Sequence, residues 1–317
     1  MSPSAAPLVV VMPVFEDVEA SSRLFRELAS KRGTDTFIVA VDDGSVKQPV
    51  EPAAISAAGL DGVVIRLRRN VGHQRAIAIG LTYAAEHFDG QQQAVVMDSD
   101  GEDTPESIGE LLHGLRHEGV DVVVATRKSR VETLRFRAFY VVYKWLFSFL
   151  SGRRISFGNF MAMKLSSVRR LASMQELWTH VAACVLNSKL RVATCALDRG
   201  PRYAGRSKMN FVGLALHGFR ALMVFAEDVL VRVGIACTLV ALLSVFGGVL
   251  ALVLKALGFA TPGWFSLVMG ILLLVFLQTG ALTLITLMLS GSVRSGGIVP
   301  AGSYRDFITV ILSSKRE

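Results

Sequence analysis

The sequence predicts an α/β fold with a mostly parallel sheet, followed by two apolar helices long enough to cross a membrane. Three observations lead to this fold class. Short apolar runs alternate with helical patterns through the first 125 residues, acidic clusters follow three of those runs, and charge-free stretches fill much of the last third. The mean hydropathy of +0.46 excludes disordered, collagen-like and small disulfide-rich chains.

Five apolar runs have the pattern of parallel strands that are buried on both faces. They are Leu8–Met12, Thr36–Val41, Gly62–Leu67, Ala94–Met97 and Val120–Ala125. Helical spacing connects them over Asp17–Lys31 and Gly72–His87. A third helix is expected after Thr104, a candidate N-cap that is followed by Pro105.

Carboxylates follow the first, second and fourth predicted strands, and the carboxyl ends of such strands form the ligand-binding edge of an open α/β sheet. They are Glu16 and Asp17, then Asp42 and Asp43, then Asp98, Asp100, Glu102 and Asp103. Converging carboxylates repel one another unless a cation lies between them, and oxygen ligands without His or Cys favour Mg²⁺ or Mn²⁺. Solvated acidic turns are the alternative. No glycine-rich dinucleotide fingerprint and no P-loop occurs, which argues against both of those nucleotide-binding classes.

Charge is distributed unevenly along the chain. Residues 1–121 carry 10 basic and 19 acidic side chains, residues 122–226 carry 18 and 3, and residues 227–317 carry 6 and 4. The basic middle section predicts an anionic partner, such as a phosphorylated ligand, lipid headgroups or nucleic acid. A merely solvated basic surface is the alternative.

Two stretches near the C-terminus, Val233–Leu254 and Trp264–Leu289, lack Asp, Glu, Lys and Arg. As helices they would measure roughly 33 and 39 Å, enough to cross a hydrocarbon core of about 30 Å. Two buried core helices are the alternative. Basic residues are concentrated outside the pair, with only Lys255 in the hairpin, so the positive-inside rule predicts cytoplasmic flanks.

Expectations for other parts of the chain follow from their composition. Phe136–Leu150 and Phe211–Val231 are predicted to lie in the membrane interface, with a core helix as the alternative for the first. Asp306–Leu312 is a candidate strand that could pair with another subunit. The N-terminus lacks the pattern of a signal peptide, and the three cysteines are expected to be packing residues in a reducing compartment.

Four motifs, taken together and in this order, resemble family 2 glycosyltransferases of the GT-A fold. They are Pro13-Val14-Phe15-Glu16-Asp17, Val41-Asp42-Asp43-Gly44-Ser45, Arg69-Asn70-Val71-Gly72 with Ala76 and Gly80-Leu81, and Asp98-Ser99-Asp100-Gly101-Glu102-Asp103. More narrowly, the chain looks like the polyprenyl-phosphate glycosyltransferases, the dolichyl-phosphate mannose synthase and bacterial GtrB-like group. The likeness covers about residues 8–290 and implies a Rossmann-like GT-A catalytic domain.

The resemblance also implies roles for individual residues. Pro13, Phe15, Glu16, Asp43, Asp98 and Ser99 would bind the nucleotide sugar, and Asp98, Asp100 and Glu102 would hold the metal. Glu102 stands where the family has Gln, which led us to expect a more anionic site. Arg202, Ser207 and Lys208 match a phosphate-binding motif, with a basic turn at the membrane surface as the alternative. Arg127 and Lys128 follow the fifth predicted strand and could serve the acceptor phosphate, with a solvated basic turn as the alternative. Asn159 replaces the family's acidic residue, and the catalytic set would be Asp100, Asn159, Arg202 and Lys208.

These expectations describe a glycosyltransferase that moves a sugar from a nucleotide-diphosphate donor to a polyprenyl phosphate, with Mg²⁺ or Mn²⁺ and inversion. Residues 1–210 would form a cytoplasmic catalytic domain, 211–230 an interfacial helix, 231–290 the membrane hairpin and 291–317 a cytoplasmic tail. The protein would lie in the inner membrane, bind no nucleic acid, and could form a homo-oligomer. A different lipid acceptor, or a non-catalytic membrane scaffold with the same fold, are the alternatives.

Overall fold

A computed structural model of the chain describes residues 7–88, 90, 92–127, 144–153, 157–203, 211–259, 261, 263–294 and 303–314. The chain divides into two compact units. The first comprises residues 1–138, 155–224 and 298–317, and the second comprises residues 139–154 and 225–297.

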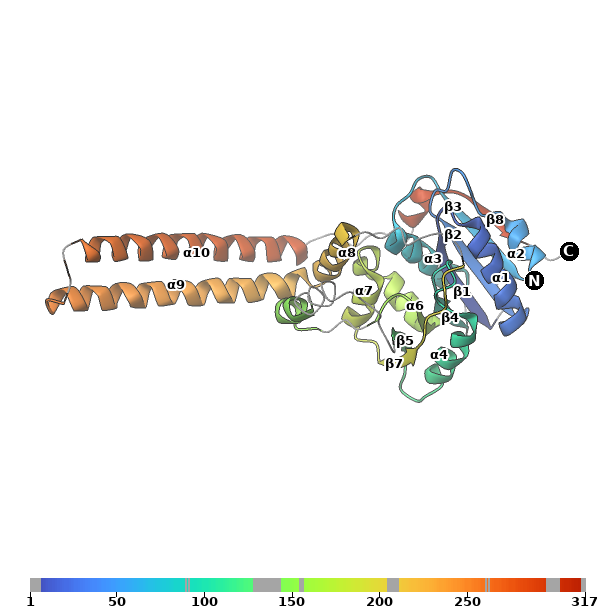
Figure 1. Ribbon diagram of the computed structural model, residues 1–317, viewed down its shortest axis with the longest axis horizontal. Helices are drawn as coiled ribbons and strands as arrows, with labels where there is room; N and C mark the ends of the chain where they lie inside the picture. The colour runs from blue at the N-terminus through green and yellow to red at the C-terminus, as the bar shows by residue number, and fades with distance from the viewer. Residues whose placement is uncertain are drawn as a thin grey trace. The chain divides into compact units, whose positions relative to one another are not determined.

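The first unit is built on a mixed sheet whose strand order, in the described residues, is β7-β5-β6-β4-β1-β2-β3-β8 (Figure 1). The strands are β1 (Leu8–Val14), β2 (Thr36–Asp42), β3 (Asp61–Leu67), β4 (Gln93–Val96), β5 (Val122–Arg127), β6 (Met161–Lys164), β7 (Val192–Leu197) and β8 (Ile308–Ser314). The four strands β1 to β4 are parallel, as is the β5–β7 pair. Strands β6 and β8 are antiparallel to their neighbours. The predicted α/β class with a mostly parallel sheet is therefore confirmed.

Helices cover both faces of this sheet, because side chains of successive strand residues point to opposite faces. Val9 and Val11 of β1 pack with α3, α6 and α7, whereas Val10 and Met12 pack with α1, α2 and α4. The helices are α1 (Val18–Arg32), α2 (Pro52–Ala57), α3 (His73–His87), α4 (Ile108–Leu115), α6 (Leu165–Ala172), α7 (Val181–Asn187) and α8 (Phe211–Met223). Burial on both faces explains why the strands are continuous apolar runs.

Gly80 sets the distance between α3 and the sheet. A Cβ at this position would lie 2.5 Å from Cγ1 of Val11 and 3.0 Å from Cγ2 of Val41. The missing side chain therefore lets α3 lie directly on β1 and β2, and this fixes the position of the helix start at His73.

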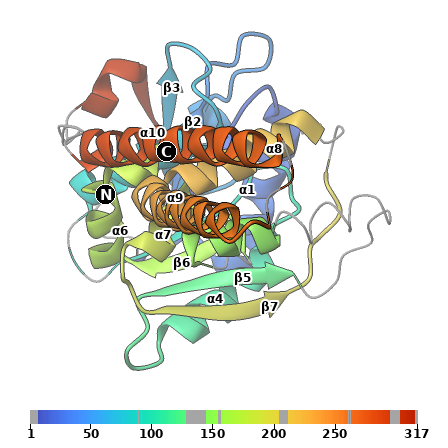
Figure 2. The same ribbon diagram turned by 90° about the vertical axis from the view of Figure 1, so that its left-hand side faces the viewer.

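Two expectations about the first unit need correction. The strand near the C-terminus does not depend on another subunit, because β8 pairs with β3 of its own chain in antiparallel register. The helix predicted after Thr104 begins as a 3₁₀ turn over Pro105–Ser107 and becomes α4 only at Ile108. In Figure 2, α4 lies beside strands β5 and β7 at the other edge of the sheet.

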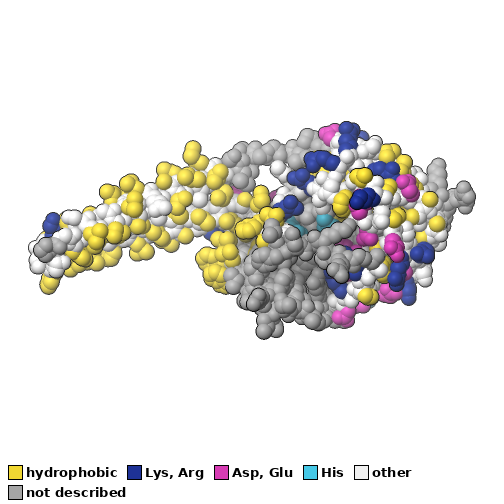
Figure 3. Space-filling view, turned by 45° about the horizontal axis from the view of Figure 1, so that its top comes forward, with side chains coloured by type: hydrophobic (Ala, Val, Ile, Leu, Met, Phe, Trp, Pro, Cys, Tyr) yellow, Lys and Arg dark blue, Asp and Glu magenta, His cyan; other side chains and the backbone are white. Residues whose placement is uncertain are grey.

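The second unit contains two long apolar helices, α9 (Ala226–Ala256) and α10 (Trp264–Arg294). They lie side by side in Figures 1 and 2, and hydrophobic side chains cover the pair in Figure 3. Both have the length and composition of membrane spans, over Ala226–Ala256 and Trp264–Leu289, which suggests membrane anchoring. The segment Phe211–Val231, expected to form an interfacial helix that leads into the first span, is not one continuous helix, since α8 ends at Met223 and α9 begins three residues later.

A short helix over residues 144–151 also belongs to the second unit. Trp145 and Phe149 stack with ring centroids 5.5 Å apart and are 65% and 63% exposed, while Phe147 is buried and lies edge-to-face against Phe225. Arg232 of α9 donates to the carbonyl of Phe149 at 3.0 Å. The aromatic segment thus has one buried and one exposed face; its residues 136–143 lie outside the described part of the chain.

Candidate active site

The turn that leads into α3 is held by the end of β2. Asp43 is 3% exposed, and its carboxylate accepts hydrogen bonds from the backbone N–H groups of Val71 at 2.7 Å and Gly72 at 3.0 Å. Burial raises the pKa of Asp43, although these two hydrogen bonds favour the charged form. Asp43 therefore fixes the turn that presents His73 at the start of α3.

Glu16 organises a second loop at the same edge of the sheet. It follows β1 with φ +48°, and its carboxylate accepts hydrogen bonds from the backbone N–H groups of Val46, Lys47 and Gln48 at 2.7–3.1 Å. The hydrogen bonds from Val46 and Lys47 lower the pKa of Glu16. Phe15, which precedes it, is 38% exposed. The loop after β2 is thus folded around Glu16, next to an exposed aromatic ring.

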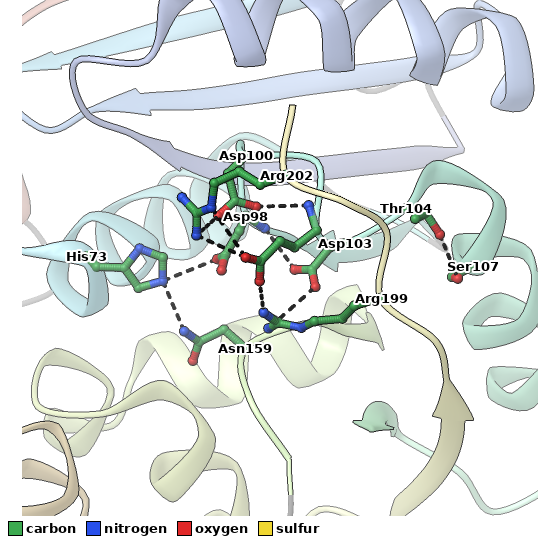
Figure 4. Close-up of polar contacts among 10 residues, drawn as sticks. His73, Asp98, Asp100, Asp103, Thr104, Ser107, Asn159, Arg199 and Arg202 are labelled. Atoms are coloured by element: carbon green, nitrogen blue, oxygen red, sulfur yellow. Dashed lines mark hydrogen bonds and ion pairs between the residues drawn. The ribbon is translucent and has the colours of Figure 1, made fainter. Parts of the chain in front are cut away.

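The acidic loop after β4 is paired with two arginines that lie about 100 residues later in the sequence (Figure 4). Arg202 Nη2 lies 2.7 Å from Asp100 Oδ2 and 3.1 Å from Glu102 Oε1. Arg199 forms an ion pair with Glu102 and lies 3.9 Å from Asp103. Glu102 thus contacts both arginines, which offset the extra negative charge that we expected from this position.

His73 connects the acidic loop with Asn159. Its Nε2 lies 3.3 Å from Asp98 Oδ1 and 3.1 Å from Asn159 Nδ2, and Figure 4 shows the three side chains pointing toward one another. Nε2 can donate to Asp98 only when it carries the proton and can accept from Asn159 Nδ2 only when it does not, so the protonation of this nitrogen decides which of the two contacts is a hydrogen bond. The sequence position where the family has an acid is therefore joined to the acidic loop through one imidazole.

The charges at this site shift one another's pKa values in different directions. Desolvation favours neutral His73, but the hydrogen bond and charge of Asp98 outweigh it and raise the pKa of His73. Burial likewise works against the charged form of Asp98, but His73 and then Arg199 and Arg202 lower its pKa. Burial raises the pKa of Asp100, and burial with the charge of Asp98 raises the pKa of Asp103 to about 7.

The carboxylates fit a hard divalent cation by their chemistry. Asp98 Oδ1 is buried with His73 Nε2 3.3 Å away, and the donor atoms of the loop are oxygens, which Mg²⁺ and Mn²⁺ prefer. Across the described ranges, however, no three His, Cys, Asp or Glu side chains form a ready metal-binding group. Asp100 and Glu102 share Arg202 instead. A cation held by Asp98, Asp100 and Glu102 would have to replace contacts that the arginines make here.

The remaining predicted residues are placed as follows. Pro13 lies buried within β1, and Ser99 is buried at 7% exposure in the acidic loop. Arg127 ends β5, and its side chain is outside the described residues, as are Lys128, Ser207 and Lys208 altogether.

Sequence reasoning assigned no role to His73 or Arg199, and it named Asp103 only as one of the carboxylates that follow the fourth predicted strand. His73 directly follows the Asn-Val-Gly turn, and Arg199 precedes Arg202 by three residues, so both lay beside motifs that were recognised. Their contacts depend on segments from distant parts of the chain. No local sequence pattern indicates those contacts.

Comparison with known proteins supports the site's family resemblance. The profile of "Glycosyl transferase family 2" matches residues 9–170. The uncharacterized glycosyltransferase YkoT of Bacillus subtilis (strain 168) is 26% identical over 290 residues, which cover 88% of this chain and 85% of that protein. A dodecaprenyl-phosphate galacturonate synthase of Rhizobium johnstonii is 25% identical over 151 residues, or 46% of this chain and 42% of that protein.

Among solved structures, this chain is similar to glucosyl-3-phosphoglycerate synthase from Mycobacterium tuberculosis in complex with Mn²⁺, uridine-diphosphate-glucose and phosphoglyceric acid. The TM-score is 0.50 at 16% identity, with 70% of this chain and 79% of that chain covered. At this identity the likeness concerns the fold, and it confirms the predicted GT-A-like sheet.

Proposed function

The chain belongs to glycosyl transferase family 2, and from this premise we propose that it moves a sugar from a nucleotide-diphosphate sugar to a polyprenyl phosphate. Family membership gives the glycosyltransferase activity and the nucleotide-sugar donor. The lipid acceptor, the metal and the inverting course of the reaction are the proposal.

The observation that supports a lipid acceptor is the pair of helices α9 and α10. Each has membrane-spanning length and composition, and both belong to the same chain as the transferase fold. The partial similarity to a dodecaprenyl-phosphate galacturonate synthase favours a polyprenyl phosphate among lipids. Asn159 agrees with a phosphate acceptor, because a phosphate monoester is largely dianionic at pH 7 and needs no general base. A hydroxyl acceptor would need one.

In this proposal Asp98, Asp100 and Glu102 hold Mg²⁺ or Mn²⁺, which would neutralise charge on the leaving nucleoside diphosphate. The nucleotide would contact Pro13, Phe15, Glu16, Asp43 and Ser99 at the edge formed by β1, β2 and the acidic loop. Arg202, with Ser207 and Lys208, would bind phosphate oxygens, because a guanidinium can contact two of them at once. Arg127 and Lys128 would serve the acceptor, and Asn159 would orient it for attack on the face opposite the leaving group.

We place the protein in the cytoplasmic membrane, with the α/β unit on the cytoplasmic side, because the basic residues lie outside the helix pair. The partners would be the soluble donor and the membrane-bound acceptor. Assembly into a homo-oligomer would be compatible with this arrangement.

A direct test uses the full-length protein in lipid nanodiscs with undecaprenyl phosphate, a panel of sugar nucleotides, and Mg²⁺ or Mn²⁺. We expect a glycolipid from at least one donor, and at least a 100-fold loss of rate in Asp100→Asn. Asp35→Asn, at an exposed position, is the matched control and should be unchanged. No glycolipid from any donor would contradict the proposal, and transfer to a diacylglycerol instead would favour the alternative acceptor. Nucleotide binding without transfer, unchanged by Asp100→Asn, would favour the scaffold.

A further inference from the structure

The segment Arg199–Tyr203 lies along the acidic loop and is fixed to it by its backbone. Gly200 N–H donates to the carbonyl of Glu102 at 2.9 Å, and Tyr203 N–H donates to the carbonyl of Asp100 at 2.9 Å. These two hydrogen bonds fall on either side of Arg202. The position of the segment's backbone along the loop therefore does not depend on which groups the arginine side chains contact.

Close packing holds this backbone in place. A Cβ at Gly101 would lie 2.4 Å from the Tyr203 ring, and a Cβ at Gly200 would lie 2.9 Å from the carbonyl oxygen of Gly101. The Tyr203 hydroxyl donates to Glu27, and the Arg23 guanidinium lies 4.2 Å from the Tyr203 ring centroid. The segment has no room to slide over the loop.

The two arginine head groups, by contrast, are partly exposed and are held by ion pairs with side chains. The side chains of Arg199 and Arg202 are 34% and 27% exposed, and their contacts with the loop are made by side chains alone. Arginine side chains have several rotatable bonds and bind phosphate oxygens as readily as carboxylates. Each head group could therefore exchange a carboxylate for a phosphate while its backbone stays in place.

A divalent cation and the two arginines need the same carboxylates. With Arg202 on Asp100 and Glu102, and Arg199 on Glu102, an added dication would share its ligands with two positive charges and be repelled by them. A nucleoside diphosphate removes this conflict, because its oxygens offer the arginines another anionic partner.

We propose that Arg199 is a phosphate-binding residue for the donor diphosphate, held by Glu102 until the nucleotide arrives, and that it competes with the metal for the acidic loop. This inference rests on the proposed transferase function, since it concerns the donor of that reaction. Metal and nucleotide must then bind cooperatively, and each raises the affinity of the loop for the other by the same factor.

The first measurement is the affinity of the full-length protein for Mn²⁺ alone, followed by the loss of the free Mn²⁺ signal in electron paramagnetic resonance. Arg199→Gln removes the competing charge, so we expect it to bind Mn²⁺ at least about fivefold more tightly than wild type. Arg199→Lys keeps the charge and should bind Mn²⁺ about as wild type does. Arg191→Gln, which breaks a distant ion pair with Asp121, is the control for removing an arginine.

The second measurement is binding of UDP, GDP, CDP and ADP at saturating Mn²⁺, with thermal unfolding as the check that each variant is folded. Arg199→Gln should bind whichever nucleotide the wild type binds at least about fivefold more weakly, which reverses its effect on Mn²⁺. A folded Arg199→Gln variant that binds Mn²⁺ no more tightly than wild type would contradict the proposed competition between Arg199 and the metal. It would leave the transferase proposal intact. A wild type that binds none of the four nucleotides would count against the transferase proposal itself.

Discussion

Gly101 is the residue at which the acidic loop and Tyr203 approach most closely. Its φ of +85° is a backbone conformation that favours glycine, and three atoms of the Tyr203 ring lie within 2.6 Å of where a Cβ would be. The absence of a side chain at this position therefore allows the aromatic ring to support the loop that carries Asp100 and Glu102.

Gly101→Ala should lower the stability of the α/β unit by about 2–4 kcal/mol, because it adds a clash with Tyr203 to the cost of a positive φ. The φ cost alone is measured by Gly33→Ala, whose φ is +76° and whose Cβ would have no atom within 4 Å. That control should cost about 1 kcal/mol. Thermal unfolding followed by intrinsic fluorescence compares the two variants.

A double-mutant cycle tests whether the clash with Tyr203 causes this loss of stability. In a Tyr203→Ala background the ring is gone, so Gly101→Ala should cost only about as much as Gly33→Ala does. An equal loss in both backgrounds would show that the ring does not limit this position.

Helices α7 and α8 meet through a pair of histidines. His180, 3% exposed, is the N-cap of α7, and its Nδ1 accepts from the backbone N–H of Ala183 at 3.2 Å. Its Nε2 lies 3.0 Å from Nε2 of His217 on α8. Since Nδ1 is an acceptor, neutral His180 carries its proton on Nε2 and donates it to His217. Burial, followed by the charges of His217, Arg220 and His73, lowers the pKa of His180 to about 3.

This pair predicts a loss of stability in acid. The folded-state pKa of His180 lies below its unfolded value near 6.5, so the unfolded state takes up the proton first as the pH falls. The stability that neutral His180 contributes is therefore complete above pH 6.5 and is lost progressively toward pH 3. Between pH 6.5 and 5 we expect a loss of about 1–2 kcal/mol.

His180→Asn is the matched variant, because Asn can also cap α7 and does not titrate. Its unfolding midpoint should fall less between pH 7 and 5 than that of wild type. Parallel pH profiles for the two proteins would rule out His180 as the source of the acid sensitivity.

The turn that leads into β8 is fastened to helix α3 by Tyr304, which is 1% exposed. Its hydroxyl donates to Glu86 Oε2 at 2.7 Å, and Arg305 contacts the same oxygen at 2.9 Å. Burial raises the pKa of Tyr304 to about 12, so the hydroxyl stays protonated as a donor.

Tyr304→Ala should leave a cavity that costs about 3–5 kcal/mol and releases β8 from β3. Amide hydrogen exchange over residues 308–314 should become much faster, while β1 in the centre of the sheet stays protected. Val310→Ala, on the same strand but 37% exposed, is the control and should change little. Unchanged exchange in Tyr304→Ala would mean that backbone pairing alone holds the strand.

The strands that were predicted have a clear hydrophobic pattern in their own residues, and the strands that were missed do not. β1, β2 and β3 are long apolar runs, so the pattern alone identified them. β6 is a four-residue strand, Met-Ala-Met-Lys, and β7 is Val-Ala-Thr-Cys-Ala-Leu, and neither has a clear period. The partner of β8 could not be read from its own residues, because β3 lies about 240 residues earlier in the sequence.

At the scale of the whole molecule, the candidate site was predictable as far as it follows from topology. Parallel strands end at one edge, so Asp43 and the acidic loop were expected there. The pairing of Arg199 and Arg202 with that loop was not predicted, since it depends on how residues 157–203 fold back over it, and neither was the contact of His73 with Asp98 from the start of α3. The acidic first third and the basic middle, noted as separate features of the sequence, meet in the ion pairs of Arg199 and Arg202.

The last prediction concerns the direction in which the chain crosses the membrane. Two spans return the chain to its starting side, so β1 to β7 before the hairpin and β8 after it can join one sheet only if both flanks share a side. Lys255 is the single charge near the turn between α9 and α10, whereas Arg220, Arg232 and Arg294 lie at the other ends. In a bacterial host, alkaline phosphatase fused after Leu257 should be active because it is exported. Green fluorescent protein fused after Glu317 should fluoresce because it stays inside. An inactive phosphatase would mean that α9 does not cross, and the reverse pattern would put the α/β unit outside the cell.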